Sequence, residues 1–132
     1  TVTGFSRDTK NGVLTMKNTV SVFPSKTKTE NMSCSEIRVS QDGKFIYTAN
    51  RDLTEEGRDS LSVLSVAQDG SLKHLETTPA AVWIPRNINL SPSGDWLLVA
   101  GQKSNEVTSH RIDKKTGKIS SKFLSRNRPF FI

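Results

Sequence analysis

The chain contains an internal repeat that limits which folds it can adopt. Ser-Gln-Asp-Gly at 40–43 and Ser-Pro-Ser-Gly at 91–94 mark the same point in two copies of one pattern. Aligning Gly43 with Gly94 places the copies 51 residues apart. The offset pairs Ile37 with Ile88, Val39 with Leu90, Ser40 with Ser91, Phe45 with Trp96 and Ala49 with Ala100. Two similar units joined in series favour a repeat architecture over a single irregular core.

Each copy is predicted to contain four short strands. In the first copy, Ser35–Ser40 alternates apolar and polar residues, and Phe45–Ala49 has the mixed apolar content of a strand covered on both faces. Leu61–Val66 and Leu72–Thr77 follow, separated by Gln-Asp-Gly at 68–70. The second copy repeats this order, and no convincing helical period occurs. Four strands in a unit of about 50 residues are typical of a β-propeller blade.

The turn between the third and fourth strands indicates how the chain begins. Residues 66–72 resemble residues 112–119, and both resemble residues 5–14, so the chain is expected to open at a third strand. The predicted fold is all-β, a partial β-propeller of about two and a half four-stranded antiparallel blades. The expected parts of this C-terminal fragment are the end of a blade at 1–24, full blades at 35–79 and 86–124, and a ring-closing strand at 127–132.

Composition narrows the classes of partner. The net charge is +6, but the basic residues are scattered and have no interleaved aromatic residues, which argues against nucleic acid and leaves a small anionic ligand. No apolar run approaches the ~20 residues that cross a bilayer, so no membrane partner is expected. A single cysteine, Cys34, fits a reducing compartment, and we expect a cytoplasmic location.

Three stretches also resemble a known family. They are Ser-Glu-Ile-Arg-Val-Ser-Gln-Asp-Gly-Lys-Phe-Ile-Tyr-Thr-Ala-Asn-Arg at 35–51, Pro-Arg-Asn-Ile at 85–88 and Ala-Gly-Gln-Lys-Ser-Asn at 100–105. They are similar to the seven-bladed propeller lactonases, which include 6-phosphogluconolactonases and fungal carboxy-cis,cis-muconate cyclases. The resemblance runs from about Gly4 to Phe131. It implies a seven-bladed parent, of which this chain supplies the last two blades and part of a third.

The resemblance implies hydrolysis of a sugar lactone, with 6-phosphogluconolactone as the expected substrate and 6-phosphogluconate as the product. The isolated fragment is expected to be inactive. One alternative is an activity like that of the carboxymuconate cyclases. Another is a non-catalytic propeller module that binds partners on its rim, because a fold does not determine a function. Open blade faces also favour self-association of the fragment.

Strand direction predicts where a site would lie. In an up-and-down sheet, first-strand starts and second-strand ends meet at one rim, and guanidinium and ammonium groups there suit a phosphate or carboxylate. A Glu at this rim is suited to orient a water molecule or to hold an Arg in place. An Arg there is suited to stabilise the oxyanion that forms during lactone hydrolysis. The family resemblance supports three of these residues as facing the channel. The predicted catalytic residues are Glu36, Arg51 and Arg86, and the predicted substrate-binding residues are Asn50, Asn87, Gln102 and Lys103.

Other interpretations of the same residues stay open. Glu36 and Arg51 are equally suited to form a structural ion pair that binds nothing, and Gln102 and Lys103 to form a solvated turn. Neither His74 nor His110 has an acidic residue or a cysteine at metal-ligand spacing, so no metal and no cofactor are expected. The sequence also lacks a Gly-x-Ser-x-Gly nucleophile motif.

Overall fold

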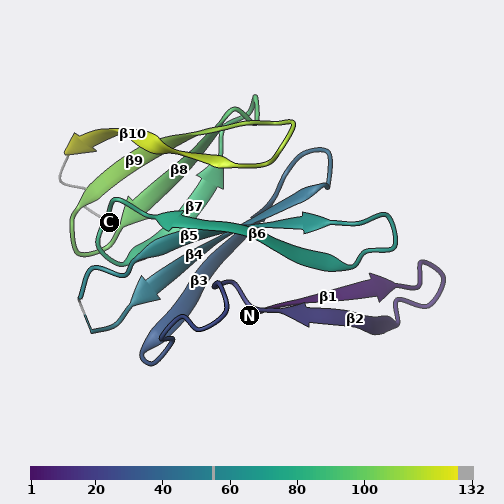
Figure 1. Ribbon diagram of the computed structural model, residues 1–132. Helices are drawn as coiled ribbons and strands as arrows, with labels where there is room; N and C mark the ends of the chain where they lie inside the picture. The colour runs from purple at the N-terminus through teal and green to yellow at the C-terminus, as the bar shows by residue number, and fades with distance from the viewer. Residues whose placement is uncertain (55, 128–132) are drawn as a thin grey trace.

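The computed structural model describes residues 1–54 and 56–127, and they form strands joined by turns and loops (Figure 1). The predicted strand at 127–132 lies outside the described residues beyond Asn127. None of the described segments is a helix long and apolar enough to cross a membrane. The ten strands are β1 (Val2–Arg7), β2 (Leu14–Val20), β3 (Met32–Val39), β4 (Phe45–Asp52), β5 (Ser60–Val66), β6 (Leu72–Pro79), β7 (Pro85–Leu90), β8 (Trp96–Gly101), β9 (Glu106–Ile112) and β10 (Ile119–Asn127).

These strands form three antiparallel sheets. The β1–β2 hairpin stands by itself, β3 to β6 make one four-stranded sheet, and β7 to β10 make another. In both larger sheets the strands are neighbours in chain order, which is the meander of a propeller blade. The prediction of two full blades and half of another is confirmed. β3 begins at Met32, three residues before the predicted start at Ser35.

The first turn of each blade explains why the repeat was visible in the sequence. Gly43 and Gly94 have φ values of 71° and 72°, a region that favours glycine. Each glycine N–H donates to the carbonyl of the serine three residues earlier, Ser40 at 2.9 Å and Ser91 at 2.8 Å. The two turns therefore have one geometry, and they set the same register for the strands on either side of them.

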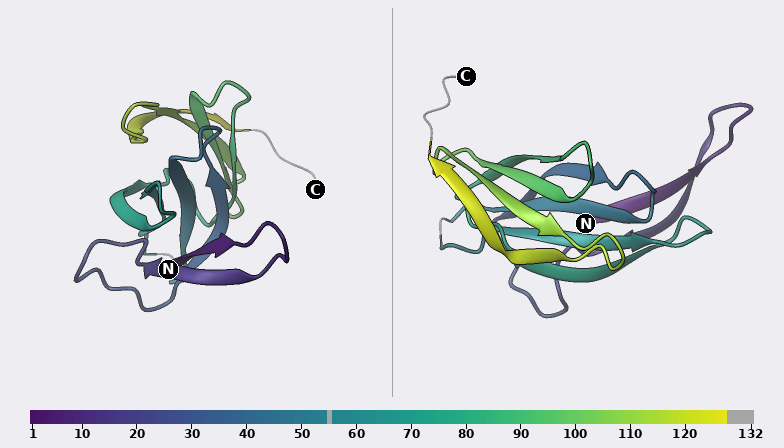
Figure 2. Two further views of the ribbon diagram at one scale, coloured as in Figure 1. Left: turned by 90° about the vertical axis from the view of Figure 1, so that its right-hand side faces the viewer. Right: turned by 90° about the horizontal axis from the view of Figure 1, so that it is seen from above.

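The two full blades pack face to face, as the turned views in Figure 2 show. Their shared core is apolar, and β3 lies against β7, the first strand of the next blade. A second cluster joins the first blade to the hairpin and includes Ile46 and Leu64. Residues 45–50 of β4 are all buried, so the prediction of a strand covered on both faces is confirmed. The shared core contains Phe45, Tyr47, Ala49, Leu61, Val63, Ala80, Val82, Ile88, Leu97, Val99, Ile112 and Ile119.

β3 alternates as predicted, but its apolar side is the uncovered one. Ile37 and Val39 are 44% and 53% exposed, whereas Glu36 and Arg38 are half-buried. The cause is the two-stranded hairpin on that side, which contacts β6 at the outer edge of the blade and does not cover β3. Phe5, Leu14 and Met16 are exposed on the hairpin itself. Association of copies of this chain through such faces stays a prediction.

His110 is a fully buried titratable group in the second blade, and we expect it to make stability depend on pH. Its Nδ1 lies 3.3 Å from the Ser120 carbonyl oxygen, and its Nε2 lies 3.2 Å from Thr108 Oγ1. Burial lowers the pKa of His110 in spite of nearby carbonyl oxygens. The unfolded chain then binds the proton more tightly than the folded chain does. The stability that the neutral, buried His110 contributes to the free energy of unfolding is therefore present above pH ~6.5 and is lost as pH falls below it.

The measurement is urea unfolding of the wild type and His110→Gln between pH 5 and 7.5. The wild type should lose up to ~1.4 kcal/mol per pH unit through this group, and the variant should lack that part of the slope. Parallel slopes in the two proteins would contradict the assignment.

Candidate functional site

The predicted site residues lie at one end of the two full blades. Met32 near the start of β3 pairs with Asp52 at the end of β4, and Pro85 at the start of β7 pairs with Gly101 at the end of β8. Because β3 and β7 are in contact, the two sets of strand ends belong to one rim. The inner strands labelled β3 and β7 cross the middle of Figure 1.

A polar network joins the first strands of the two blades. Glu36 Oε1 accepts a hydrogen bond from Arg38 Nη1 at 2.7 Å, and Glu36 Oε2 accepts one from Asn87 Nδ2 at 2.7 Å. Arg38 Nε donates to Asn89 Oδ1 at 3.3 Å. Both carboxylate oxygens of Glu36 are therefore engaged, and the side chain aligns Arg38 and Asn87.

The network connects equivalent positions of the repeat. Glu36 and Asn87 are 51 residues apart, and so are Arg38 and Asn89. Sequence reasoning included Glu36 and Asn87 but missed Arg38 and Asn89 as site residues. Two signals pointed to them: the alternation put Arg38 on the same face as Glu36, and the repeat offset put Asn89 opposite Arg38.

Arg86 is an exposed cation at the rim. Its side chain is exposed, and it makes no hydrogen bond or ion pair within the described part of the chain. The register of β7 shifts between Pro85 and Asn87, so Arg86 occupies a bulge, a feature that often redirects a side chain. It lines a hollow of about 430 Å³ together with Asn87, Gln102 and Glu106. The structure thus brings together three of the predicted residues, Arg86, Asn87 and Gln102.

Arg51 and Asn50 bond within their own blade. Arg51 Nη2 donates to Ser33 Oγ at 2.9 Å, and its buried Nε has no partner in the described residues. The alternative of a structural Glu36–Arg51 ion pair is wrong, because Glu36 is paired with Arg38. Asn50 is fully buried, and its Nδ2 donates to Ser62 Oγ at 2.7 Å. This geometry gives Asn50 a structural role and gives its predicted contact with substrate no support.

Lys103 lies in a separate recess beside Trp83, which sequence reasoning did not single out. Trp83 is 56% exposed in the crossover between the blades. The backbone N–H of Trp83 donates to Ser104 Oγ at 3.2 Å, and the backbone carbonyl of Trp83 accepts from the backbone N–H of Lys103 at 3.2 Å. Ile84 next to it has a φ of 54°, which is unusual for a β-branched residue. These bonds fix the crossover onto the loop after β8, so Trp83 and Lys103 are held together at the rim.

Metal chemistry has no candidate centre in the part of the chain that the structure describes. Its His, Cys, Asp and Glu side chains form no group of three or more that could hold an ion. The arrangement at the rim consists instead of guanidinium, amide and carboxylate groups. Such groups bind and orient an anionic, oxygen-rich molecule.

Comparison with known proteins decides the family. The model of the family described as "Lactonase, 7-bladed beta-propeller" matches residues 1–128. The chain belongs to the seven-bladed β-propeller lactonases. A 6-phosphogluconolactonase from Formosa agariphila is 39% identical over 93 residues, which cover 70% of this chain and 26% of that protein.

Solved structures agree with the fold of this lactonase chain. A protein from Lactobacillus plantarum superposes with a TM-score of 0.79 at 27% identity, over 89% of this chain and 33% of that one. A periplasmic gluconolactonase from Pseudomonas aeruginosa superposes with a TM-score of 0.78 at 25% identity, over 95% of this chain and 33% of that one. The chain therefore spans about a quarter to a third of the length of these three proteins.

Proposed function

We propose that this chain is part of a propeller lactonase that hydrolyses a phosphorylated sugar lactone, 6-phosphogluconolactone being the expected substrate. The observation that carries the proposal is the rim of the two blades. A network of Glu36, Arg38 and Asn87 there lies beside the exposed Arg86, which has no partner in the part of the chain that the structure describes. The name of the Formosa agariphila relative supports the choice of substrate.

The proposed roles follow from which atoms are free. Among the described residues no group occupies the guanidinium of Arg86, so it is available for the phosphate of the substrate, an anion that such a fork binds well. Arg38 Nη2 makes no hydrogen bond within the described residues and is suited to stabilise the oxyanion formed when water attacks the lactone carbonyl. Glu36 holds Arg38 and Asn87 in place and is a positioning residue.

In the reaction, the oxygen of water bonds to the carbonyl carbon and the ring C–O bond breaks. One proton of the water passes to the ring oxygen, which leaves as a hydroxyl, and the other proton is released to solvent as the carbonyl carbon becomes the carboxylate carbon of the product. Arg51 at this rim stays a predicted contributor, with Ser33 as its present partner. A reducing, cytoplasmic location is part of the proposal and rests on the single cysteine, Cys34.

The test replaces Arg86 by alanine in the protein that carries this segment within a complete set of blades. We expect kcat/KM for 6-phosphogluconolactone to fall about 30-fold, the equivalent of roughly 2 kcal/mol for one charge-assisted contact. Arg111→Ala is the matched control, because Arg111 is also exposed but stacks on Trp96 with 5.9 Å between its Cζ and the ring centroid.

Unchanged hydrolysis in Arg86→Ala would remove the proposed anion site. If the intact protein hydrolyses no lactone and instead captures another protein, the non-catalytic binding module replaces the enzyme as the better interpretation. The isolated 132-residue chain is expected to show no turnover.

A further inference from the structure

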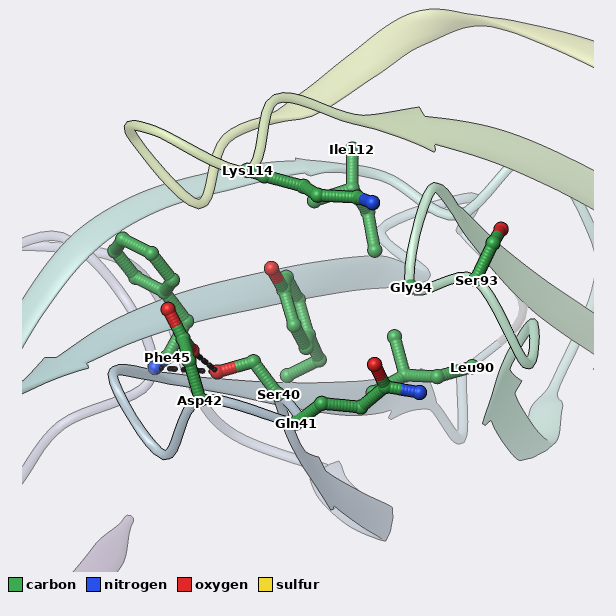
Figure 3. A pocket seen from close by; sticks show the side chains of 10 residues that line it. Ser40, Gln41, Asp42, Phe45, Leu90, Ser93, Gly94, Ile112 and Lys114 are labelled. Atoms are coloured by element: carbon green, nitrogen blue, oxygen red, sulfur yellow. Dashed lines mark hydrogen bonds between the residues drawn. The ribbon is translucent and has the colours of Figure 1, made fainter.

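A second hollow lies at the end of the blades away from Arg86. Three turns meet there: the β3–β4 turn, the β7–β8 turn and the β9–β10 turn. Figure 3 shows the labelled side chains around it, with Phe45 and Leu90 on different sides and Lys114 extending across. Its volume is about 140 Å³, and Phe45, Leu90 and Ile112 form apolar walls.

The side chain of Tyr47 brings a hydroxyl into this hollow, and that hydroxyl has no protein partner among the described residues. Tyr47 is 1% exposed. Tyrosine side chains that are this deeply buried usually have a hydrogen-bond partner for the hydroxyl, so the hydroxyl of Tyr47 is available to a ligand. Burial, with smaller effects of Asp42 and Glu76, raises the pKa of Tyr47 to about 12. The hydroxyl therefore keeps its proton at neutral pH and is available as a donor.

The charged groups at the mouth of the hollow already have partners. Lys114 Nζ lies 2.9 Å from Asp95 Oδ1. Asp42 accepts a hydrogen bond from Ser40 Oγ at 2.7 Å, and its other oxygen lies 3.6 Å from Lys44 Nζ. A charged ligand would have to compete with these pairs, so the hollow favours a neutral molecule.

Size and polarity narrow the ligand further. A cavity of about 150 Å³ lined by apolar side chains takes up one benzene molecule, so about 140 Å³ matches a single six-membered ring. Ser40, Gln41 and Ser93 also line the hollow, but the walls formed by Phe45, Leu90 and Ile112 offer no partners to the hydroxyls that surround a sugar ring, and leaving those hydroxyls without partners is costly. A single oxygen on the ring is enough to accept the hydrogen bond that the Tyr47 hydroxyl can donate.

We propose that this hollow binds a neutral six-membered ring that carries one oxygen, with the ring between Phe45, Leu90 and Ile112 and the oxygen accepting the Tyr47 hydroxyl proton. Phenol is the simplest ligand of this class. The site is separate from the rim that carries Arg86, and it does not depend on lactone hydrolysis.

In the experiment, phenol and benzene are titrated separately into the 15N-labelled full chain and into its Tyr47→Phe variant. The NMR chemical shifts of the backbone amides report binding. Phenol should shift the amides of Phe45, Leu90 and Ile112 saturably. Tyr47→Phe should weaken phenol binding about fivefold, the value of one net hydrogen bond, and leave benzene binding unchanged. The variant should fold, because the hydroxyl it removes has no partner among the described residues.

Ser93→Trp keeps the Tyr47 hydroxyl and places a large side chain at the exposed mouth of the hollow, so it should abolish the binding of both ligands. The proposal is overturned if phenol gives no saturable shift, or if its shifts lie away from the three wall residues. Equal weakening of phenol and benzene by Tyr47→Phe would overturn it too, because the hydroxyl would then not recognise the oxygen.

Discussion

Replacing Asp52 by alanine is expected to lower the free energy of unfolding by about 3 kcal/mol, because it leaves a cation and two backbone N–H groups without their acceptor. Asp52 lies at the end of β4, and its side chain is 0% exposed. Arg58 Nη2 donates to its Oδ1 at 2.9 Å, and Arg58 Nε donates to its Oδ2 at 3.0 Å. The backbone N–H groups of Thr54 and Arg58 donate to the same carboxylate at 3.0 and 3.1 Å.

The same carboxylate makes stability fall in acid. The hydrogen bond from Arg58, followed by those from Thr54, holds the pKa of Asp52 well below its usual value, although burial opposes the shift. A carboxyl whose pKa is depressed by folding contributes stability above its unfolded pKa of ~3.9 and loses it as pH falls toward the folded value. The loss should therefore appear below pH ~4, and Asp52→Ala should show less of it.

Urea unfolding at pH 7 and at pH 3 measures both effects. Asp69→Ala is a matched control, because Asp69 also accepts from a backbone N–H two residues on, at 3.0 Å, but lies on the exposed β5–β6 turn. We expect a much smaller loss there. If the two substitutions lower the free energy of unfolding equally at pH 7, the buried Asp52–Arg58 pair stabilises the fold no more than the hydrogen bond of an exposed turn does.

The blades could be predicted from the sequence because their signals are local. Gly43 and Gly94 each end a four-residue turn, and each turn is closed by a hydrogen bond to the serine three residues earlier. The alternation in Ser35–Ser40 needs only neighbouring residues to be recognised. It did not reveal that Ile37 and Val39 would be the exposed side, since that depends on how many strands the neighbouring sheet supplies.

The partners at the rim were harder to predict, because they depend on irregularities of the strands. The register of β3 shifts between Cys34 and Ile37, and the register of β7 shifts between Pro85 and Asn87. A bulge changes which residues face one another, and no local pattern in the sequence indicated the bulge in β3 or the bulge in β7. Glu36 was therefore expected near Arg51 at the rim, whereas it pairs with Arg38 and Asn87.

Gly117 in the β9–β10 turn should tolerate no side chain. Its φ is 73°, and a Cβ built on it would lie closer than 3.0 Å to three ring carbons of Phe45. The left-handed backbone costs a non-glycine residue ~1–2 kcal/mol, and forcing an extra carbon into a packed site costs a further ~1–3 kcal/mol. We expect Gly117→Ala to lower the free energy of unfolding by about 3 kcal/mol.

Gly70→Ala separates the two causes in this prediction. Gly70 has a φ of 81°, but no heavy atom of the described residues lies within 4 Å of its added Cβ, so only the backbone cost of about 1 kcal/mol remains. In a Phe45→Leu background, which removes the ring, Gly117→Ala should cost no more than Gly70→Ala does. Urea unfolding of these variants tests the contact: if Gly117→Ala stays equally costly without the ring, the turn backbone and not Phe45 explains the glycine.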